Sequence, residues 1–393
     1  MSGCIEATLS HIRENIRMLT LNAESLEQAL EAGCLLGRLN WINNDGKLED
    51  EALEVALLKK YNGELLSRSK PESLLGEIDW LHVITNAYDS GGHTPLLKNI
   101  VNGLVARGSD QNVVVTDSVT KRFLEDITAM IGLEPIQLNG PLAERASALI
   151  RLGRRAKYIV LYIHPNDLGA ALAARILRRE GHRVLFVNHA DHVFSYGPGA
   201  ADTVLEISGW GWNATKRGRM ICSQSFLGIP LEASISRSRP PLNGPVISIG
   251  GGDKYKPGNN IVNFPTFLQK LLPLIDQKVE LIGPKGTEFW WQDLIMQHKG
   301  QVQFFGTLPY NETQCRLIAA SAYLDSFPIT GGTAFPQALV AGKVVFGLRE
   351  QSGGYSLADM LRYSSVEAMT EALVLYLRTG EEPLMQDFVR TSI

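Results

Sequence analysis

Apolar and polar positions follow two different rhythms along the chain. Within residues 1–75 the apolar side chains recur every three or four positions, as in 26–33 and 51–61. This spacing predicts amphipathic helices, and the turn formers at 43–46 separate them. The region shows no strand pattern. It is interpreted either as a cap for acceptor binding or oligomerisation, or as a packing appendage, and the second interpretation is favoured.

From residue 79 the pattern changes to short, continuous apolar runs that alternate with helical periodicity. Such runs are typical of parallel strands buried on both faces, and right-handed crossovers between them build a Rossmann-like layer sandwich. Strands are expected at 79–85, 112–117, 135–138, 157–163, 182–187, 203–207 and 220–223, with helices at 96–107, 121–131, 142–155 and 167–180.

A segment rich in Ser, Arg, Pro and Gly then indicates a linker, and a second alternating series follows it. We therefore expect an α/β protein in which two Rossmann-like domains face a cleft, with an N-terminal helical appendage. The predicted parts are a helical region 1–75, an N-terminal domain 76–233, a linker 234–245 and a C-terminal domain 246–393 with terminal helices.

Composition adds several exclusions to this picture. The 393 residues are 45% hydrophobic and 20% charged, with a formal net charge of −3. This balance is ordinary for globular proteins and provides no overall basic field for nucleic acid. The four cysteines lack CxxC spacing, so neither a zinc site nor a disulfide framework is expected.

The chain shows no apolar run of about 18 residues and no signal-peptide pattern at its start. We expect a cytoplasmic protein and leave peripheral membrane contact open.

Residues 325–345 read as the end of a buried strand, a glycine turn, a short helix and the next strand. Pro336 falls in the first turn of that helix, where a missing N–H is tolerated. A helix that opens at Gly331, Gly332 and Thr333 presents free backbone N–H groups, which suits a phosphate. The alternative interpretation is an ordinary strand-to-helix junction in which the glycines only permit the turn.

A second glycine turn follows the first predicted strand of this domain, at 250–257. Gly251 allows the backbone to approach a ligand, and Lys254 and Lys256 carry charges that suit a diphosphate. Either lysine is alternatively a solvated surface residue. Two phosphate-competent turns at strand ends of one domain are more specific than one.

Two common nucleotide motifs are missing from the sequence. It has no GxxxxGK[ST], which disfavours a P-loop NTPase. Nor does it show GxGxxG followed by an acid about 20 residues later, which disfavours a dinucleotide oxidoreductase.

Two stretches of the N-terminal domain carry candidate acid–base chemistry. Gly92 allows close backbone approach to a ligand, and His93 is a candidate general base or a polar helix cap. His189, Asp191 and His192 follow another strand. A metal is disfavoured there because no second ligand cluster is evident, and a hydrogen-bonded cluster in which Asp191 orients an imidazole is preferred.

With these motifs assembled, the chain resembles the GT-B glycosyltransferases that use nucleotide sugars. It is most similar, distantly, to bacterial protein N-glucosyltransferases and O-GlcNAc transferases, although it has no tetratricopeptide repeats. The resemblance covers about residues 79–350 and rests on the stretches 91–94, 188–192, 250–257, 280–284, 305–308 and 325–342.

The resemblance implies transfer of a hexosyl or N-acetylhexosaminyl group from a nucleotide diphosphate sugar, with UDP favoured, to an unidentified glycan, lipid or protein. It implies no metal and no further cofactor. Lys254 or Lys256 would neutralise the diphosphate, and the turn 331–333 would bind it. His93, or the cluster of His189, Asp191 and His192, would deprotonate the acceptor.

The segment 352–356 would contact the sugar or ribose, unless it is a mobile surface loop. Two alternatives to transfer remain. One is a nucleotide-sugar epimerase or hydrolase of the same fold, and the other is a non-catalytic nucleotide-sugar-binding protein.

Overall fold

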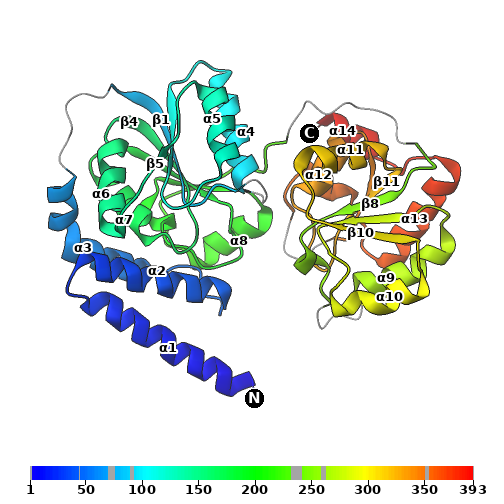
Figure 1. Cartoon of the computed structure of the whole chain (residues 1–393), viewed down its shortest axis with the longest axis horizontal. Coiled ribbons are helices and arrows are strands. Elements are labelled where there is room, and N and C mark those ends of the chain that lie inside the picture. The colour runs from blue at the N-terminus through cyan, green and yellow to red at the C-terminus, as the bar shows by residue number, and fades with distance from the viewer. Residues whose placement is uncertain are drawn as a thin grey trace. The chain divides into compact units, whose positions relative to one another are not determined.

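The computed structural model describes residues 2–43, 45–69, 76–88, 93–231, 241–257, 263–349 and 354–392 (Figure 1). The chain divides into two compact units, Met1–Gly228 and Ile229–Ile393. Each unit is built on a parallel sheet, of seven strands in the first and five in the second. The predicted α/β fold with two Rossmann-like sheets and a helical N-terminal region is confirmed.

The first sheet has the strand order β3-β2-β1-β4-β5-β6-β7, and all its neighbouring strands are parallel. The strand order changes direction between β1 and β4. Ligands of parallel sheets bind beyond the carboxyl ends of the strands at such a switch point. The strands are β1 (Ile78–Ile84), β2 (Gln111–Val115), β3 (Ile136–Gln137), β4 (Ala156–Tyr162), β5 (Arg183–Asn188), β6 (Thr203–Glu206) and β7 (Gln224–Phe226).

The last strand of this sheet is not where the apolar pattern placed it. The prediction of a strand at 220–223 is wrong, because β7 begins at Gln224. Met220 is exposed, and its N–H donates to Glu49 Oε1 at 2.6 Å instead of joining the sheet. As an edge strand with exposed side chains, β7 lacks the apolar run that identifies buried strands.

Eight α-helices are described in the first unit. Helices α2 and α3 pack against α6 and α7, and together they share one hydrophobic core with the sheet (Figure 1). The helices are α1 (Ser2–Asn22), α2 (Leu26–Ile42), α3 (Glu51–Arg68), α4 (His93–Val105), α5 (Lys121–Ile131), α6 (Leu142–Gly153), α7 (Leu168–Arg179) and α8 (Gly209–Gly218).

Two glycines allow α2 to approach the rest of the unit closely. A Cβ at Gly33 would lie 2.2 Å from Leu168 Cδ2, and one at Gly37 would lie 2.6 Å from Tyr196 Cε2 and 2.9 Å from the backbone of Asn166. The Tyr196 hydroxyl donates to the Gly33 carbonyl at 3.0 Å. A Cβ at Gly37 would clash with backbone, and one at Gly33 would displace a leucine methyl, so the two glycines allow α2 to pack at this distance.

Polar contacts also anchor the N-terminal helices. The Glu27 carboxylate accepts the Leu142 and Ala143 N–H groups, each at 2.8 Å, and so caps α6, whose own N-cap residue, Pro141, has no side-chain bond. On α7, the buried Arg175 pairs with Glu51 and with Glu54, the latter at 2.9 Å. The helical region is therefore an integral part of the first unit.

The second sheet has the order β10-β9-β8-β11-β12, again with parallel neighbours. Pro336 lies in the first turn of its helix, as expected, and Pro265 lies in the first turn of α9 (Phe264–Leu271). The strands are β8 (Val246–Ile249), β9 (Val279–Ile282), β10 (Val302–Gly306), β11 (Ala322–Leu324) and β12 (Val344–Phe346), and the helices are α9 (Phe264–Leu271), α10 (Gln292–Gln297), α11 (Tyr310–Ala319), α12 (Ala334–Val340), α13 (Val366–Thr379) and α14 (Gln386–Ser392).

Lys343 precedes β12 and is fully buried. Its ammonium donates to the carbonyls of Ile318 at 2.5 Å and Ala320 at 3.1 Å, at the C-terminus of α11. Burial lowers the pKa of Lys343 to about 8. This lysine therefore joins α11 to β12 by satisfying carbonyls that the helix leaves free.

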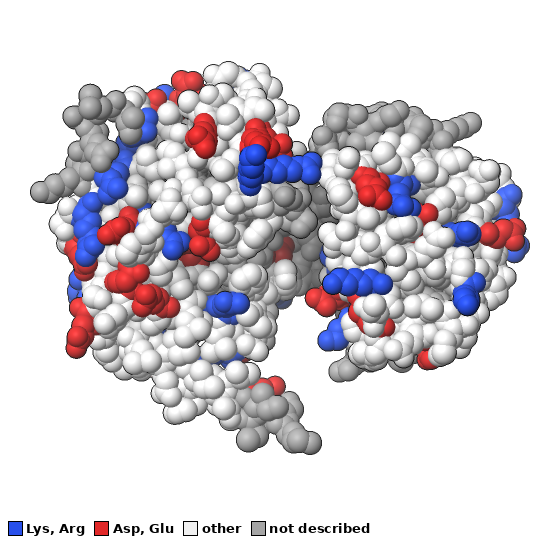
Figure 2. Space-filling view, viewed as in Figure 1, with Lys and Arg blue, Asp and Glu red and all other residues white. Residues whose placement is uncertain are grey.

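Charged side chains are mixed on the face shown in Figure 2, where basic and acidic groups alternate without a broad patch of one sign. Among the described residues, no helix has both the length and the apolar character that crossing a membrane requires.

We predict opposite effects of alanine at two helical glycines. Gly37→Ala should reduce the free energy of unfolding by about 1–3 kcal/mol, because its Cβ would overlap the Tyr196 ring. Gly63 of α3 is the control. A Cβ there meets nothing within 4 Å, so Gly63→Ala should stabilise by about 0.5–1 kcal/mol. Urea unfolding, with hydrogen exchange in α2 peptides, measures both effects. Equal effects of the two changes would contradict the packing role of Gly37.

Candidate functional site

Three histidines meet at the carboxyl edge of the first sheet. His164 follows β4, His189 follows β5, and His93 begins α4, the helix after β1. The ring centroids of His93 lie 5.3 Å from those of both His164 and His189, and the latter two are 6.5 Å apart. Strands β1, β4 and β5 are neighbours in the sheet, which explains why loops distant in sequence converge here.

Hydrogen bonds determine which ring nitrogens carry protons. His93 Nε2 lies 2.7 Å from the Asn86 carbonyl, so it is the donor and Nδ1 keeps its lone pair. His164 Nδ1 accepts from Asn86 Nδ2 at 3.2 Å. The orientation of that amide follows from its oxygen, which accepts the N–H and hydroxyl of Ser118 at 3.0 and 2.7 Å. His189 Nδ1 donates to the Val187 carbonyl at 3.3 Å.

All three rings are neutral near pH 7. Burial lowers the pKa of His93, and the hydrogen bond to Asn86 opposes this only in part. Burial, together with the neighbouring histidines, lowers the pKa of His164 to about 4 and that of His189 to about 3. A neutral His93 with an unprotonated Nδ1 has the form that a general base requires.

The stretch 188–192 divides into two parts. His189 joins His93, as just described, whereas the buried Asp191 accepts the Ser208 hydroxyl at the start of α8. Asp191 also lies 3.2 Å from Nδ1 of His192, whose side chain is 67% exposed. Asp191 therefore contacts the imidazole of His192 and not those of His93 or His189.

Metal-type side chains are dispersed in the part of the chain that the structure describes: no three His, Cys, Asp or Glu side chains there are placed to hold a metal ion. The expectations that no metal and no further cofactor are needed stay predictions.

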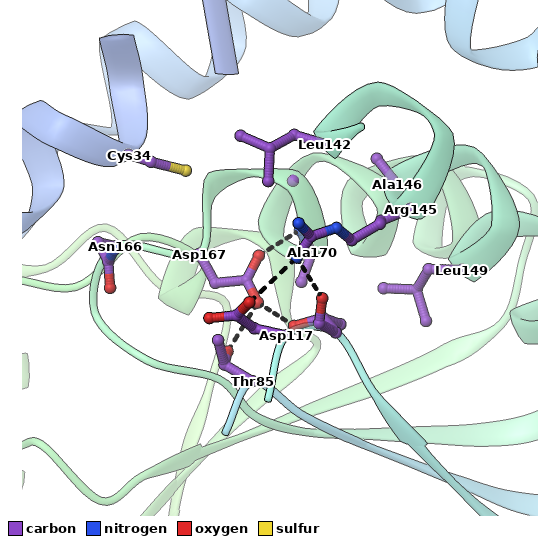
Figure 3. Close-up of a pocket in the computed structure, with 12 residues that line it drawn as sticks. Cys34, Thr85, Asp117, Leu142, Arg145, Ala146, Leu149, Asn166, Asp167 and Ala170 are labelled. Carbon is purple, nitrogen blue, oxygen red and sulfur yellow. Dashed lines mark hydrogen bonds and ion pairs between the residues drawn. The ribbon is translucent and has the colours of Figure 1, made fainter. Parts of the chain in front are cut away.

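A cavity of about 220 Å³ opens at the same sheet edge (Figure 3). Thr85 links the cavity to the histidines, because its hydroxyl accepts the backbone N–H of His164 at 2.9 Å. The Asp167 carboxylate in its wall accepts the hydroxyls of Thr85 and Thr116 at 2.7 and 2.5 Å. Arg145 reaches Asp117 at 3.3 Å. The polar groups that line the cavity thus mainly bond to one another, and these bonds connect the loops beside the histidines.

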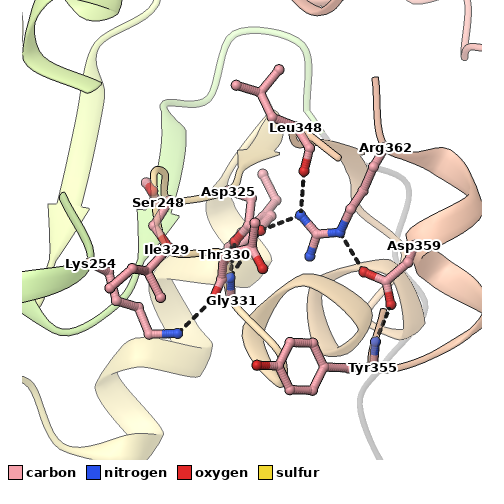
Figure 4. A network of polar contacts seen from close by, with 12 residues as sticks. Ser248, Lys254, Asp325, Ile329, Thr330, Gly331, Leu348, Tyr355, Asp359 and Arg362 are labelled. Atoms are coloured by element: carbon pink, nitrogen blue, oxygen red, sulfur yellow. Dashed lines mark hydrogen bonds and ion pairs between the residues drawn. The ribbon is translucent and has the colours of Figure 1, made fainter. Parts of the chain in front are cut away.

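In the second unit, two loops at the carboxyl edge of the sheet meet. Lys254, after β8, donates from Nζ to the Thr330 carbonyl in the loop after β11 at 2.7 Å (Figure 4). The two predicted phosphate-competent turns are therefore adjacent. Strands β8 and β11 are neighbours in this sheet, which brings their following loops together.

The loop after β11 is organised around a buried acid that was not among the predicted site residues. Asp325 is fully buried and accepts the Gly331 N–H at 3.0 Å and the Tyr323 hydroxyl at 3.1 Å. Arg362 Nη1 donates to it at 2.6 Å. In this structure the Gly331 N–H is thus bound to Asp325 and is not presented to a ligand.

Arg362 extends this network toward residue 355. The Cζ atom of its guanidinium lies 4.0 Å from the centroid of the Phe335 ring. The guanidinium also pairs with Asp359 (Figure 4). The Asp359 carboxylate in turn accepts the N–H groups of Tyr355 and Ser356, each at 2.7 Å. This chain of contacts fixes the described end of the predicted sugar-contact segment, while residues 352 and 353 lie outside the described residues.

The remaining predicted site residues lie at the margins of these loops. Gly332 is close to Tyr355, since a Cβ at the glycine would lie 2.9 Å from Tyr355 Cδ1. Thr333 precedes α12 and is exposed, without a side-chain capping bond. Gly251 and Lys256 are exposed as well. Gly92 lies outside the described residues.

Sequence reasoning did not select His164, although the rule that selected His189, a polar residue directly after a buried strand, applies to it equally. Asp359 and Arg362 carried no such signal, because they lie beyond the last predicted strand and act through contacts with Asp325 and residue 355.

No protein-family model and no curated sequence matches the chain. Among solved structures, the chain is similar to a glycosyltransferase from Rickettsia africae ESF-5, with a TM-score of 0.58 and 11% identity over 80% of this chain and 93% of that one. The Anabaena protein HepE in complex with UDP-glucose also has a TM-score of 0.58, with 14% identity over 80% of this chain and 94% of that one.

A mutant of the Thermobaculum terrenum O-GlcNAc transferase has a TM-score of 0.53 and 13% identity, over 93% of this chain and 74% of that one. At these identities the similarity establishes the fold. The expected resemblance to GT-B glycosyltransferases is confirmed at that level.

We predict that acid destabilises the first unit through its partly buried neutral histidines. The unfolded chain takes up protons below pH 6.5, whereas folded His189, with a pKa of about 3, does not. Stability therefore falls as pH falls from 6.5 toward 4. His189→Gln should make this dependence less steep by up to about 1.4 kcal/mol per pH unit. Urea unfolding at several pH values measures it, with His11→Gln on the exposed side of α1 as the control. An unchanged slope in His189→Gln would contradict this assignment.

We predict that Arg362→Met destabilises the second unit by about 3–5 kcal/mol, because Asp325 would be left buried without its cation. Lys270→Met, on the exposed side of α9, removes the same charge and should change stability by no more than about 0.5 kcal/mol. Hydrogen exchange in peptides of β11 and β12 reports the local loss. Equal protection in both variants would show that the ion pair does not hold the loop.

Proposed function

We propose that the protein is a glycosyltransferase that moves a sugar from a nucleotide diphosphate sugar, with a UDP-sugar favoured, to an acceptor hydroxyl or amide. The observation that carries this proposal is the similarity, over 80% of this chain, to HepE in complex with UDP-glucose. The convergence of functional side chains at the carboxyl edge of each sheet supports it, because ligands of such sheets bind there.

The donor diphosphate is proposed to bind at the loops after β8 and β11. Lys254 already lies in contact with the second loop, and the exposed Lys256 is two residues away. Their ammonium groups would offset the charge of the diphosphate as it leaves. Gly332 and Thr333 would contribute a backbone N–H and a hydroxyl, and no metal takes part in the proposal.

The acceptor is proposed to be activated by His93. Its unprotonated Nδ1 would take the acceptor proton while the acceptor atom bonds to the anomeric carbon and the bond to the diphosphate oxygen breaks. His164 and His189, both neutral, place no positive charge beside it. General-base assistance of this kind is worth about 10²–10⁴-fold in rate.

Titration calorimetry with UDP and UDP-glucose tests the donor site. Lys254→Ala or Lys256→Ala should weaken binding about tenfold or more, since each removes a cation from the diphosphate. Lys270→Ala, on the exposed side of α9, should bind as the parent does. Unchanged affinity in both loop variants would refute the donor-site assignment.

Product analysis with the donor alone separates transfer from its alternatives. Turnover of UDP-glucose without an acceptor would favour an epimerase or hydrolase. Tight binding without turnover across a broad acceptor panel would favour a binding protein. Turnover in the parent that is lost in His93→Ala, with donor affinity retained, would support the proposed base.

A further inference from the structure

One face of α2 is directed toward the histidines. Gly33, Gly37 and Trp41 are spaced four residues apart and therefore lie on the same side of the helix. The two glycines set the close packing of α2 described above. Trp41, one turn further along, has its ring centroid 5.7 Å from that of His164, at an interplanar angle of 63°. The N-terminal helical region thus contributes a side chain to the candidate site.

Tyr88 lies on another side of the same group. Its ring is 6.1 Å from that of His93, edge to face, and 6.3 Å from that of His164. Tyr88 is 42% exposed, and Trp41 and the three histidines are each partly exposed. We call these side chains the aromatic cluster, which consists of Trp41, Tyr88, His93, His164 and His189.

None of the five side chains of the aromatic cluster carries a positive charge near pH 7. Among the described residues, no Lys or Arg is a cause of the pKa shifts of its three histidines. The charged groups that act on His164 are the carboxylates of Asp167 and Asp117. The histidines are neutral near pH 7, as described above. An anionic group entering the cluster would lose its hydration without gaining a counter-charge, so the cluster disfavours phosphates and carboxylates.

We propose that the aromatic cluster is the acceptor subsite and that it takes an uncharged sugar, whose ring packs on Trp41 while one hydroxyl reaches His93. This inference rests on the proposed glycosyltransferase function. A sugar ring presents C–H groups on its face and hydroxyls at its rim. The C–H groups of the sugar face pack on aromatic rings, whose surfaces are electron-rich. The hydroxyls form hydrogen bonds with imidazole nitrogens, which accept or donate.

Saturation-transfer NMR in the absence of donor tests the proposal. The probes are methyl β-D-glucoside, methyl β-D-galactoside and methyl N-acetyl-β-D-glucosaminide, each compared with its 6-phosphate. At least one neutral glycoside should receive saturation from the parent protein, and the phosphates should bind at least tenfold more weakly. Binding of none of the neutral glycosides, or tighter binding of the phosphates, would overturn the proposal.

Variants locate the subsite. Trp41→Ala should abolish glycoside binding, and Trp41→Phe should retain part of it because a ring remains. Trp80, near the start of β1, stacks on Tyr158 at 4.4 Å and lies outside the aromatic cluster. Trp80→Ala should therefore leave binding unchanged. Equal binding in Trp41→Ala and the parent would assign the glycoside to another site.

Calorimetry with UDP-glucose on the same samples keeps the two proposals apart. Trp41→Ala should bind UDP-glucose as the parent does, because the donor site lies in the second unit. Hydrogen exchange in α2 peptides shows whether the first unit of the variant is folded. If the parent binds UDP-glucose but no neutral glycoside, the acceptor inference fails and the donor proposal stands. If the parent binds a glycoside through Trp41 but no nucleotide, the donor proposal fails. The aromatic cluster is then a sugar-binding site without the proposed transfer.

Discussion

All neighbouring strands in both described sheets are parallel, and this constraint determines where chemistry is placed. Every strand of a parallel sheet ends at the same edge, and helices cover its faces, so the loops at that edge are the places where polar side chains gather. In the first unit these loops bring together His93, His164 and His189. In the second they bring Lys254 to the Thr330 carbonyl. Residues up to about 100 positions apart thereby become neighbours without any local sequence signal.

The N-terminal helix α2 packs against the loops at this edge of the first sheet. Glu27 of α2 binds the free N–H groups at the start of α6, and Gly33 and Gly37 allow α2 to pack within contact distance of the loops after β4 and β5. Buried charge pairs between α3 and α7 hold the same layer. Because α2 packs closely and Glu27 binds it to the start of α6, Trp41 has a defined position beside His164. A region that looks like an appendage in the sequence thus supplies part of the wall around the histidines.

In the second unit, a buried acid organises the loop that was predicted to bind phosphate. An unpaired carboxylate at that place would repel a diphosphate, but Asp325 pairs with Arg362 and accepts the Gly331 N–H. The acid therefore shapes the loop from beneath, and the lysines of the neighbouring loop carry the net positive charge. Arg362 also reaches Asp359, which holds residues 355 and 356. One buried ion pair thus connects three segments of the loop region.

The sequence by itself determined the features that depend on local pattern. Apolar periodicity separated helices from strands, and Pro336 marked the first turn of its helix correctly. The α/β fold with its helical N-terminal region followed from these patterns, and His93 and His189 were selected because they follow strands. Edge strand β7 was misplaced, since its exposed side chains carry no apolar signal. Only the tertiary structure decided that His164 and Trp41 join His93, that Asp191 contacts His192, and that Asp325 pairs with Arg362. The physical reason is that periodicity and turn chemistry act over a few neighbouring residues, whereas these contacts depend on which strands and helices pack side by side.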